Sequence, residues 1–261
     1  MQEPQILNLS DDFGARDIAT VHQSGATPGV MWMQGFRSDM ISTKAAALAE
    51  WASETGTELT RFDYSAHGQS SGVFEEATLS QWLADCVAVH DAHASGQAVL
   101  VGSSMGGYLT MLLHDALPTA PHAIVLIAPA WDMTEALIWN EFTDEIRNTV
   151  MTDGVWLRPS AYGDPYPITR RLIEDGRKHL YANKPWRPRC PVRIIHGRLD
   201  PDVPFEHGEA LVEMIKAGDQ SADVRLLEVP DGEHRLSRPE DVALLIQTIE
   251  AVRRDRSARA D

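Results

Sequence analysis

Short apolar runs alternate with amphipathic stretches along most of this chain. The apolar runs are bounded by glycine, proline or polar residues, and the longer stretches between them carry apolar residues at helical spacing. Such alternation is typical of βαβ units and predicts an α/β fold with a mostly parallel central sheet flanked by helices. The expected strands span residues 6–10, 18–23, 30–34, 59–64, 98–101, 123–127, 192–196 and 224–229, and the expected helices span residues 42–55, 78–95, 105–114, 206–217 and 238–253.

The alternation stops between residues 131 and 188. This segment has helical stretches and many aromatic residues but no convincing core strand, and prolines interrupt it repeatedly. We interpret residues 131–188 as a helical cap inserted between two strands, and residues 1–130 and 189–261 as the core of one large domain. The polar tail RRDRSARAD at the end of the sequence is expected to fray.

Charge and composition narrow the classes of partner. The chain has 38 acidic and 23 basic residues, and its net charge of −15 repels nucleic-acid phosphates and anionic membrane surfaces. Its apolar runs are shorter than the roughly 18 residues of a membrane span. The opening stretch MQEPQILNLSDD lacks the basic and apolar regions of a secretory signal. We therefore expect neither nucleic-acid binding nor a membrane span.

The two cysteines, Cys86 and Cys190, lie far apart in the sequence. Their spacing matches neither a disulfide framework nor a Cys-x-x-Cys metal site, so we interpret both as structural. Low cysteine usage is typical of a reducing compartment, and a cytoplasmic location is expected.

One short stretch, AVLVGSSMGGYL at residues 98–109, predicts chemistry. A continuous apolar run reads as a buried parallel strand, and a helical pattern begins at Met105. Gly102 to Gly106 then form G-x-S-x-G at a tight strand-to-helix turn, where small flanking residues let the strand and helix pack closely and Ser104 is exposed above the sheet. Ser104 is the candidate nucleophile, and the alternative reading is a glycine-rich packing turn.

A serine hydroxyl needs a base, and the base needs an orienting acid, in the chain order nucleophile, acid, base. The loop HGRLDPDVP after a late strand places Asp200 as the candidate acid, with Asp202 and Asp132 as alternatives. His234, between the last strand and the last helix, is the candidate base. Of the other histidines, His196 is expected to be a satisfied core residue, and His67 lies in a loop near the expected mouth of the site.

Two backbone N–H groups are expected to form an oxyanion hole. One belongs to Met105, the residue after the nucleophile, and the other to Phe36, in the turn after the early buried strand at residues 30–34.

Together these residues resemble the α/β-hydrolase family along nearly the whole chain. The most similar branch is that of the mitochondrial palmitoyl-protein thioesterase and acyl-glucuronide esterase within the abhydrolase-domain group. The stretches that carry this similarity are residues 61–72, 101–109, 154–162 and 196–204. The resemblance implies an α/β-hydrolase fold, hydrolysis of esters or thioesters by Ser104, Asp200 and His234, and neither a metal nor an organic cofactor. One departure is Gln34-Gly35, where many relatives have His-Gly.

The cap is expected to cover the serine and to line an apolar acyl slot. The candidate lining residues are Trp131, Met133, Trp139, Phe142, Trp156 and Tyr162. Arg37, beside the oxyanion turn, could receive a substrate carboxylate, although a surface salt bridge is the simpler expectation.

The sequence thus predicts a serine hydrolase that takes a small ester or thioester substrate. The alternatives are a non-catalytic binding protein on the same fold, a serine peptidase and a perhydrolase. The sequence leaves the oligomeric state open.

Overall fold

The computed structural model describes residues 3–94, 98–160, 163–182 and 184–255, so most of the polar tail lies outside the described residues. Within these ranges the main sheet has eight strands in the order β1-β2-β4-β3-β5-β6-β9-β10. Strand β2 runs antiparallel to its neighbours β1 and β4, and the remaining pairs are parallel. The strands are β1 (Gln5–Asp11), β2 (Gly14–Gln23), β3 (Ala26–Met33), β4 (Thr57–Phe62), β5 (Val99–Ser103), β6 (Ala123–Ile127), β9 (Val192–Gly197) and β10 (Val224–Val229).

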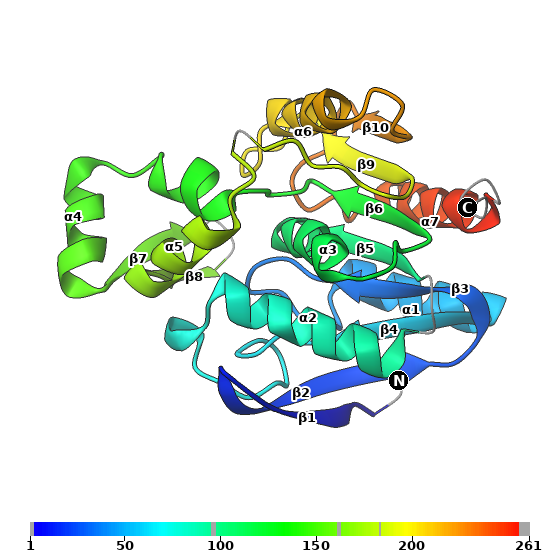
Figure 1. Cartoon of the computed structure of the whole chain (residues 1–261), viewed down its shortest axis with the longest axis horizontal. Helices are drawn as coiled ribbons and strands as arrows, with labels where there is room; N and C mark the ends of the chain where they lie inside the picture. Colours follow the sequence, from blue (N-terminus) through cyan, green and yellow to red (C-terminus); the bar gives the residue numbers. More distant parts are fainter. Residues whose placement is uncertain (1–2, 95–97, 161–162, 183, 256–261) are drawn as a thin grey trace.

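Helices cover both faces of this sheet (Figure 1). On one face, the largest apolar cluster joins the sheet to α2, α3 and α6. On the other face, a second cluster joins it to α1 and α7. The helices of the core are α1 (Thr43–Thr55), the 3₁₀ turn η1 (Phe74–Glu76), α2 (Leu79–His93), α3 (Met105–Ala116), α6 (Phe205–Gly218) and α7 (Pro239–Arg254).

The elements agree closely with the expected ones, and the predicted fold class is confirmed. Every residue of β5 is buried, as a central parallel strand requires. Helix α1 ends at Gly56 with φ of 63°, a left-handed conformation that costs glycine little. Helix α2 begins after Thr78, whose hydroxyl accepts a hydrogen bond from the Gln81 N–H.

The segment that interrupts the alternation departs from expectation because it is not wholly helical. Besides helical elements, it contains a separate two-stranded antiparallel sheet, β7–β8. Pro159, Pro165 and Pro167 can lie in these strands because each strand has an unpaired edge. The prolines were therefore misleading as turn signals. The elements of the segment are η2 (Thr134–Trp139, a π-helix), α4 (Asp144–Asp153), β7 (Val155–Ser160), β8 (Gly163–Thr169), α5 (Arg170–Gly176) and η3 (Arg177–His179).

This segment, which we interpret as the cap, projects from the core beyond the end of β5 where α3 begins (Figure 1). The limits of the cap at residues 131 and 188 stay a prediction.

Candidate active site

Ser104 lies at a sharp bend between β5 and α3. Its φ of 55° and ψ of −120° lie in a region that residues with a side chain rarely adopt. Glycines on both sides make the bend possible. A Cβ on Gly102 would lie 2.2 Å from the Gly106 carbonyl oxygen, and one on Gly106 would lie 2.1 Å from the Met33 carbonyl oxygen. Strand and helix therefore approach more closely than larger residues would permit.

Backbone hydrogen bonds hold Ser104 in this strained conformation. Its N–H donates to the Ile127 carbonyl at the end of β6 over 2.8 Å. Its carbonyl accepts the N–H of Gly107 at 2.9 Å and that of Ala130 at 3.1 Å. Strand β6, the loop that follows it and the first turn of α3 thus fix the position of the serine, which remains partly exposed.

The three predicted catalytic side chains form one hydrogen-bonded chain. His234 Nε2 lies 3.0 Å from Ser104 Oγ. His234 Nδ1 lies 2.8 Å from Asp200 Oδ2. Asp200 is completely buried at its side chain, whereas 16% of the His234 side chain is exposed. These distances match those expected between a nucleophile, a base and an orienting acid.

The loops after β9 and β10 bring Asp200 and His234 together. The Leu199 N–H donates to the Gly232 carbonyl over 2.9 Å, which ties the acid loop to the base loop. A Cβ on Gly197 would lie 2.3 Å from the same carbonyl oxygen, so this contact requires glycine at position 197. Because β9 and β10 are parallel neighbours, their following loops meet at one edge of the sheet.

Hydrogen bonds keep the Asp200 carboxylate ionised. Burial by itself would raise the pKa of this group, but hydrogen bonds to His196, His234 and the Val203 N–H hold the pKa well below its usual range. Oδ1 accepts the N–H groups of Asp202 at 2.9 Å and Val203 at 2.8 Å. A permanent negative charge therefore faces His234.

Of the two alternative acids, Asp132 has a different place. Its carboxylate accepts the N–H groups of Tyr181 and Ala182, each at 2.8 Å, and so anchors the end of the cap segment. Asp202 lies close to the site, and its oxygen, an Asp200 oxygen and a His234 nitrogen lie within 4.8 Å of one another. Although this trio could bind a metal ion, the direct hydrogen bond between His234 and Asp200 already satisfies both groups.

His196 departs from the expectation of a fully satisfied core histidine. It is completely buried, and its Nε2 lies 2.9 Å from the Val203 carbonyl oxygen and 3.5 Å from Asp200 Oδ2. Its Nδ1 has no hydrogen-bond partner within the described residues. His196 thus contacts the loop that carries Asp200 through its Nε2 only.

The expected oxyanion turn lies directly against Ser104. A Cβ on Gly35 would lie 3.3 Å from Ser104 Cβ and 3.9 Å from Ser104 Oγ. For the N–H groups of Phe36 and Met105, the described part of the chain offers no hydrogen-bond acceptor. The Gln34 side chain, at the departure from His-Gly, is buried and likewise has no partner among the described residues.

Sequence reasoning missed a contact beneath this turn. His67 is buried, and its Nε2 accepts the backbone N–H of Arg37 at 3.2 Å. Residues 61–72, which include His67, are similar to the same stretch of the α/β-hydrolase family, but the partner of this histidine depends on the folded chain. The only signal in the sequence was the position of His67 after a strand, at the edge of the sheet where the other site residues lie.

Arg37 forms no ion pair with any described residue, so the simpler expectation of a surface salt bridge is wrong. Its guanidinium group lies over two rings, 5.8 Å from the centroid of Phe74 and 5.7 Å from that of Tyr166. A cavity of about 280 Å³ opens here, lined among others by Arg37, His67 and Phe74.

The cap aromatic residues have diverse contacts. Trp131 stacks on His207 at 4.4 Å, Met133 is buried in the main cluster, and Trp156 packs edge-on against Phe142 at 5.1 Å. The guanidinium groups of Arg147 and Arg177 both lie over the Trp139 ring, 5.5 and 4.9 Å from its centroid. Tyr162 lies outside the described residues.

One face of the β7–β8 hairpin points toward the oxyanion turn. Trp156 pairs with Ile168 and Arg158 with Tyr166, so these four side chains share a face. The Tyr166 ring packs against Phe36 at 5.7 Å. Trp156 therefore lies on the same face of the hairpin as Tyr166, which packs against Phe36 of the core.

Neither cysteine is suited to act as a nucleophile. Both are free thiols. Burial raises the pKa of Cys190 to about 12 and that of Cys86 well above its usual range.

Known proteins match most of the length of this chain. A family model described as "Alpha/beta hydrolase family" matches residues 21–244. The human mitochondrial palmitoyl-protein thioesterase ABHD10 is 33% identical over 228 residues, which are 87% of this chain and 73% of that protein.

Solved structures agree over nearly the whole chain. A putative hydrolase from Agrobacterium vitis S4 has a TM-score of 0.91 at 38% identity, covering 96% of this chain and 98% of its own. Alpha/beta hydrolase domain-containing protein 10 from mouse has a TM-score of 0.85 at 30% identity, with the same coverage of both chains.

These comparisons contradict the expected cytoplasmic location. The relatives from Homo sapiens, Pongo abelii and Bos taurus are named as mitochondrial. Low cysteine usage indicates a reducing environment but does not distinguish one reducing compartment from another, which is why the inference failed. Of the helices in the described part of the chain, none combines the length and apolar character needed to cross a bilayer.

Proposed function

Because the chain belongs to the alpha/beta hydrolase family, we propose that it is a serine hydrolase that cleaves carboxylic esters or thioesters through an acyl-enzyme. The observation that carries this proposal is the unbroken hydrogen-bonded chain from Ser104 through His234 to the buried Asp200. The name of the mitochondrial relatives, palmitoyl-protein thioesterase, supports acyl transfer from sulfur or oxygen.

In the first half of the reaction, Ser104 Oγ attacks the acyl carbonyl. Asp200 accepts a hydrogen bond from the protonated Nδ1 of His234, which leaves Nε2 unprotonated and facing the serine hydroxyl. Nε2 takes the serine proton as the bond to carbon forms. The Asp200 carboxylate then stabilises the imidazolium, and His234 returns the proton to the departing alcohol or thiol.

The N–H groups of Phe36 and Met105 would bind the oxyanion that develops on the carbonyl oxygen. Their lack of acceptors within the described residues supports this role, as does the contact of Gly35 with Ser104. One such donor typically contributes about 3 kcal/mol to the chemical step. In the second half, water attacks the acyl-enzyme with His234 as the base, and Ser104 is regenerated.

The substrate would lie between the core and the cap. Trp156 and Met133 are proposed to line the acyl slot, which the orientation of the β7–β8 hairpin supports for Trp156. Arg37 is proposed to meet a substrate carboxylate, since this residue is exposed and forms no ion pair with another described residue. For Trp131 and Trp139, a part in the slot stays a prediction.

A panel of acyl esters and acyl thioesters of graded chain length tests this function. We expect hydrolysis by the wild type and a loss of at least about 10³-fold in Ser104→Ala. Equal rates for the two proteins would instead favour a non-catalytic binding protein. The ratio of ester to thioester turnover assigns the substrate class.

A further inference from the structure

His67 is held in one orientation by its surroundings. Its ring packs edge-on against Tyr64, Phe74 and Trp82, with centroids 5.5, 5.4 and 5.3 Å away. The Phe36 ring joins the same group through Phe74 at 5.2 Å and Trp82 at 5.9 Å. The imidazole and the side chain of the oxyanion turn therefore belong to one aromatic cluster.

The hydrogen bonds of His67 define its tautomer. Nδ1 lies 3.1 Å from the Ser65 carbonyl oxygen, which can only accept, so Nδ1 carries the proton. Nε2 is then an acceptor, and it receives the Arg37 N–H at 3.2 Å. Burial, and to a lesser degree the Arg37 charge, lowers the pKa of His67 to about 4, so the ring stays neutral at neutral pH.

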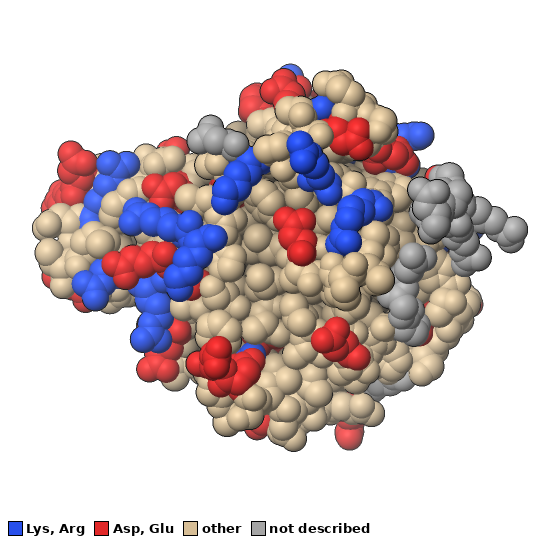
Figure 2. Space-filling view, viewed as in Figure 1, with Lys and Arg blue, Asp and Glu red and all other residues tan. Residues whose placement is uncertain are grey.

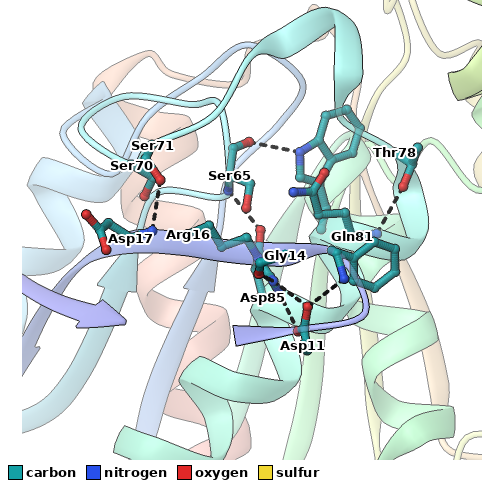
Figure 3. Close-up of polar contacts among 12 residues, drawn as sticks. Asp11, Gly14, Arg16, Asp17, Ser65, Ser70, Ser71, Thr78, Gln81 and Asp85 are labelled. Carbon is teal, nitrogen blue, oxygen red and sulfur yellow. Dashed lines mark hydrogen bonds and ion pairs between the residues drawn. The ribbon is translucent and has the colours of Figure 1, made fainter. Parts of the chain in front are cut away.

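The Ser65 carbonyl is itself fixed by a buried network that begins at the N-terminal hairpin (Figure 3). The Ser65 N–H donates to Asp85 Oδ2 at 2.8 Å, and Asp85 Oδ1 accepts from Arg16 Nε at 2.7 Å. Two other guanidinium nitrogens of Arg16 donate to the Asp11 carboxylate at 2.6 and 2.9 Å. The support of His67 thus reaches across β2, α2 and the loop after β4.

The turn that His67 contacts is strained. Arg37 has a φ of 56°, and a left-handed conformation of this kind costs a residue with a side chain about 1 kcal/mol or more unless its surroundings hold it. The hydrogen bond from the Arg37 N–H to His67 is such a restraint. Since Phe36 precedes Arg37 directly, the same bond sets the direction of the peptide groups around Phe36.

We propose that His67 is a positioning residue for the oxyanion turn: by accepting the Arg37 N–H, it orients the turn so that the Phe36 N–H meets the developing oxyanion. The inference rests on the serine-hydrolase function proposed above. His67 touches no reacting atom, and it acts through the backbone of Arg37 and Phe36.

The test replaces His67 by Phe, which keeps an aromatic ring but removes the acceptor. We expect kcat for an oxygen ester to fall about 10- to 30-fold with little change in KM, because a misplaced donor weakens transition-state binding. A thionoester of the same acid supplies the diagnostic readout, since its sulfur is a poor hydrogen-bond acceptor. The preference of the wild type for the oxygen ester should shrink in His67→Phe by about the same factor as kcat.

His114 offers a matched control far from the site in the fold. It is also buried, its Nε2 accepts the Arg189 N–H at 3.1 Å, and its ring packs edge-on against Trp186. His114→Phe should lower the free energy of unfolding but leave kcat and the thionoester preference unchanged. Should His67→Phe fail to fold, His67→Gln and His67→Met replace it, because only the glutamine offers an acceptor, and we expect only its kcat to approach that of the wild type.

The outcomes separate the two proposals. If the wild type hydrolyses esters but the His67 and His114 variants behave alike, or if the thionoester preference does not change, the positioning role is overturned and the proposed function stands. If the wild type hydrolyses none of the acyl compounds and Ser104 does not react with a fluorophosphonate, both proposals are overturned.

Discussion

The serine bend and the cap hold their side chains by different means. At the bend, residues 102–107 are fixed by backbone hydrogen bonds and by glycines whose Cβ atoms would clash at 2.1–2.9 Å. In the cap, rings pack on rings and guanidinium groups cover Trp139. Lys and Arg side chains gather over the cap, mixed with Asp and Glu (Figure 2).

This difference indicates that the bend determines the chemistry and that the cap determines which substrate is preferred. The bend places one oxygen through main-chain geometry, so the identity of its small residues is dictated by sterics. The cap depends on side-chain packing, which tolerates substitution more readily. We therefore expect changes near the bend to abolish turnover or folding, and changes in the cap to alter which substrate is preferred.

The largest effect should come from the acid that serves the bend. Asp200→Asn removes the charge that fixes the His234 tautomer, and kcat/KM should fall about 10³- to 10⁴-fold. Asp202→Asn, two residues along the same loop, should change kcat/KM by less than about 3-fold. Steady-state kinetics on one ester compares both, and an equal loss in the two variants would reassign the acid.

Replacing one glycine in each region by alanine compares how far the bend and the cap tolerate a change, with the free energy of unfolding as the measure. Gly106→Ala would place a Cβ 2.1 Å from the Met33 carbonyl oxygen and 2.5 Å from that of Gln34, and we expect a loss of at least about 3 kcal/mol. Gly154, which follows α4 in the cap, has a φ of 84° and open space around its Cβ position. Gly154→Ala should cost only about 1 kcal/mol. Urea unfolding measures both, and similar losses would remove the contrast between bend and cap.

Stability should also depend on pH through the region beside the bend. Because the pKa of His67 is lowered to about 4 in the folded protein, the unfolded chain binds the proton more tightly. The contribution of His67 to the free energy of unfolding is complete above the unfolded pKa of about 6.5. As the pH falls from there toward 4, this contribution decreases by about 2–3 kcal/mol.

Urea unfolding between pH 7 and pH 4 isolates this contribution when the wild type is compared with His67→Phe. The advantage of the wild type should shrink as the pH falls. An advantage that stays constant over this range would show that His67 titrates normally.

The smallest effect should be a change of selectivity in the cap. Trp156→Ala should raise KM for long acyl esters about 10-fold, which corresponds to losing part of one buried aromatic surface, and should alter short esters little. Trp139→Ala, which removes a ring in contact with two guanidinium groups, should alter chain-length preference less. A uniform change over all chain lengths in Trp156→Ala would mean that this ring does not line the slot.

Much of the core was predictable because its signals are local. A buried strand, two glycines and a helix start define the bend within residues 102–107, and strand ends place Asp200 and His234 at one edge. The choice of Asp200 over Asp132 followed from spacing, and the structure pairs Asp200 with His234.

What escaped the sequence depends on contacts between distant segments. The β7–β8 hairpin contains prolines that normally indicate turns, and only its separate two-stranded pairing accommodates them. The contact of His67 with Arg37 joins residues 30 positions apart, and that of Arg37 with Phe74 and Tyr166 joins the core to the cap. No periodicity or spacing in the sequence predicts either of these contacts.

The most direct test of the central claim is intact-protein mass spectrometry after reaction with a fluorophosphonate. The account predicts one adduct per chain on the wild type, located at Ser104 by peptide mapping, and no adduct on Ser104→Ala. An adduct on another residue, or equal labelling of the two proteins, would contradict it.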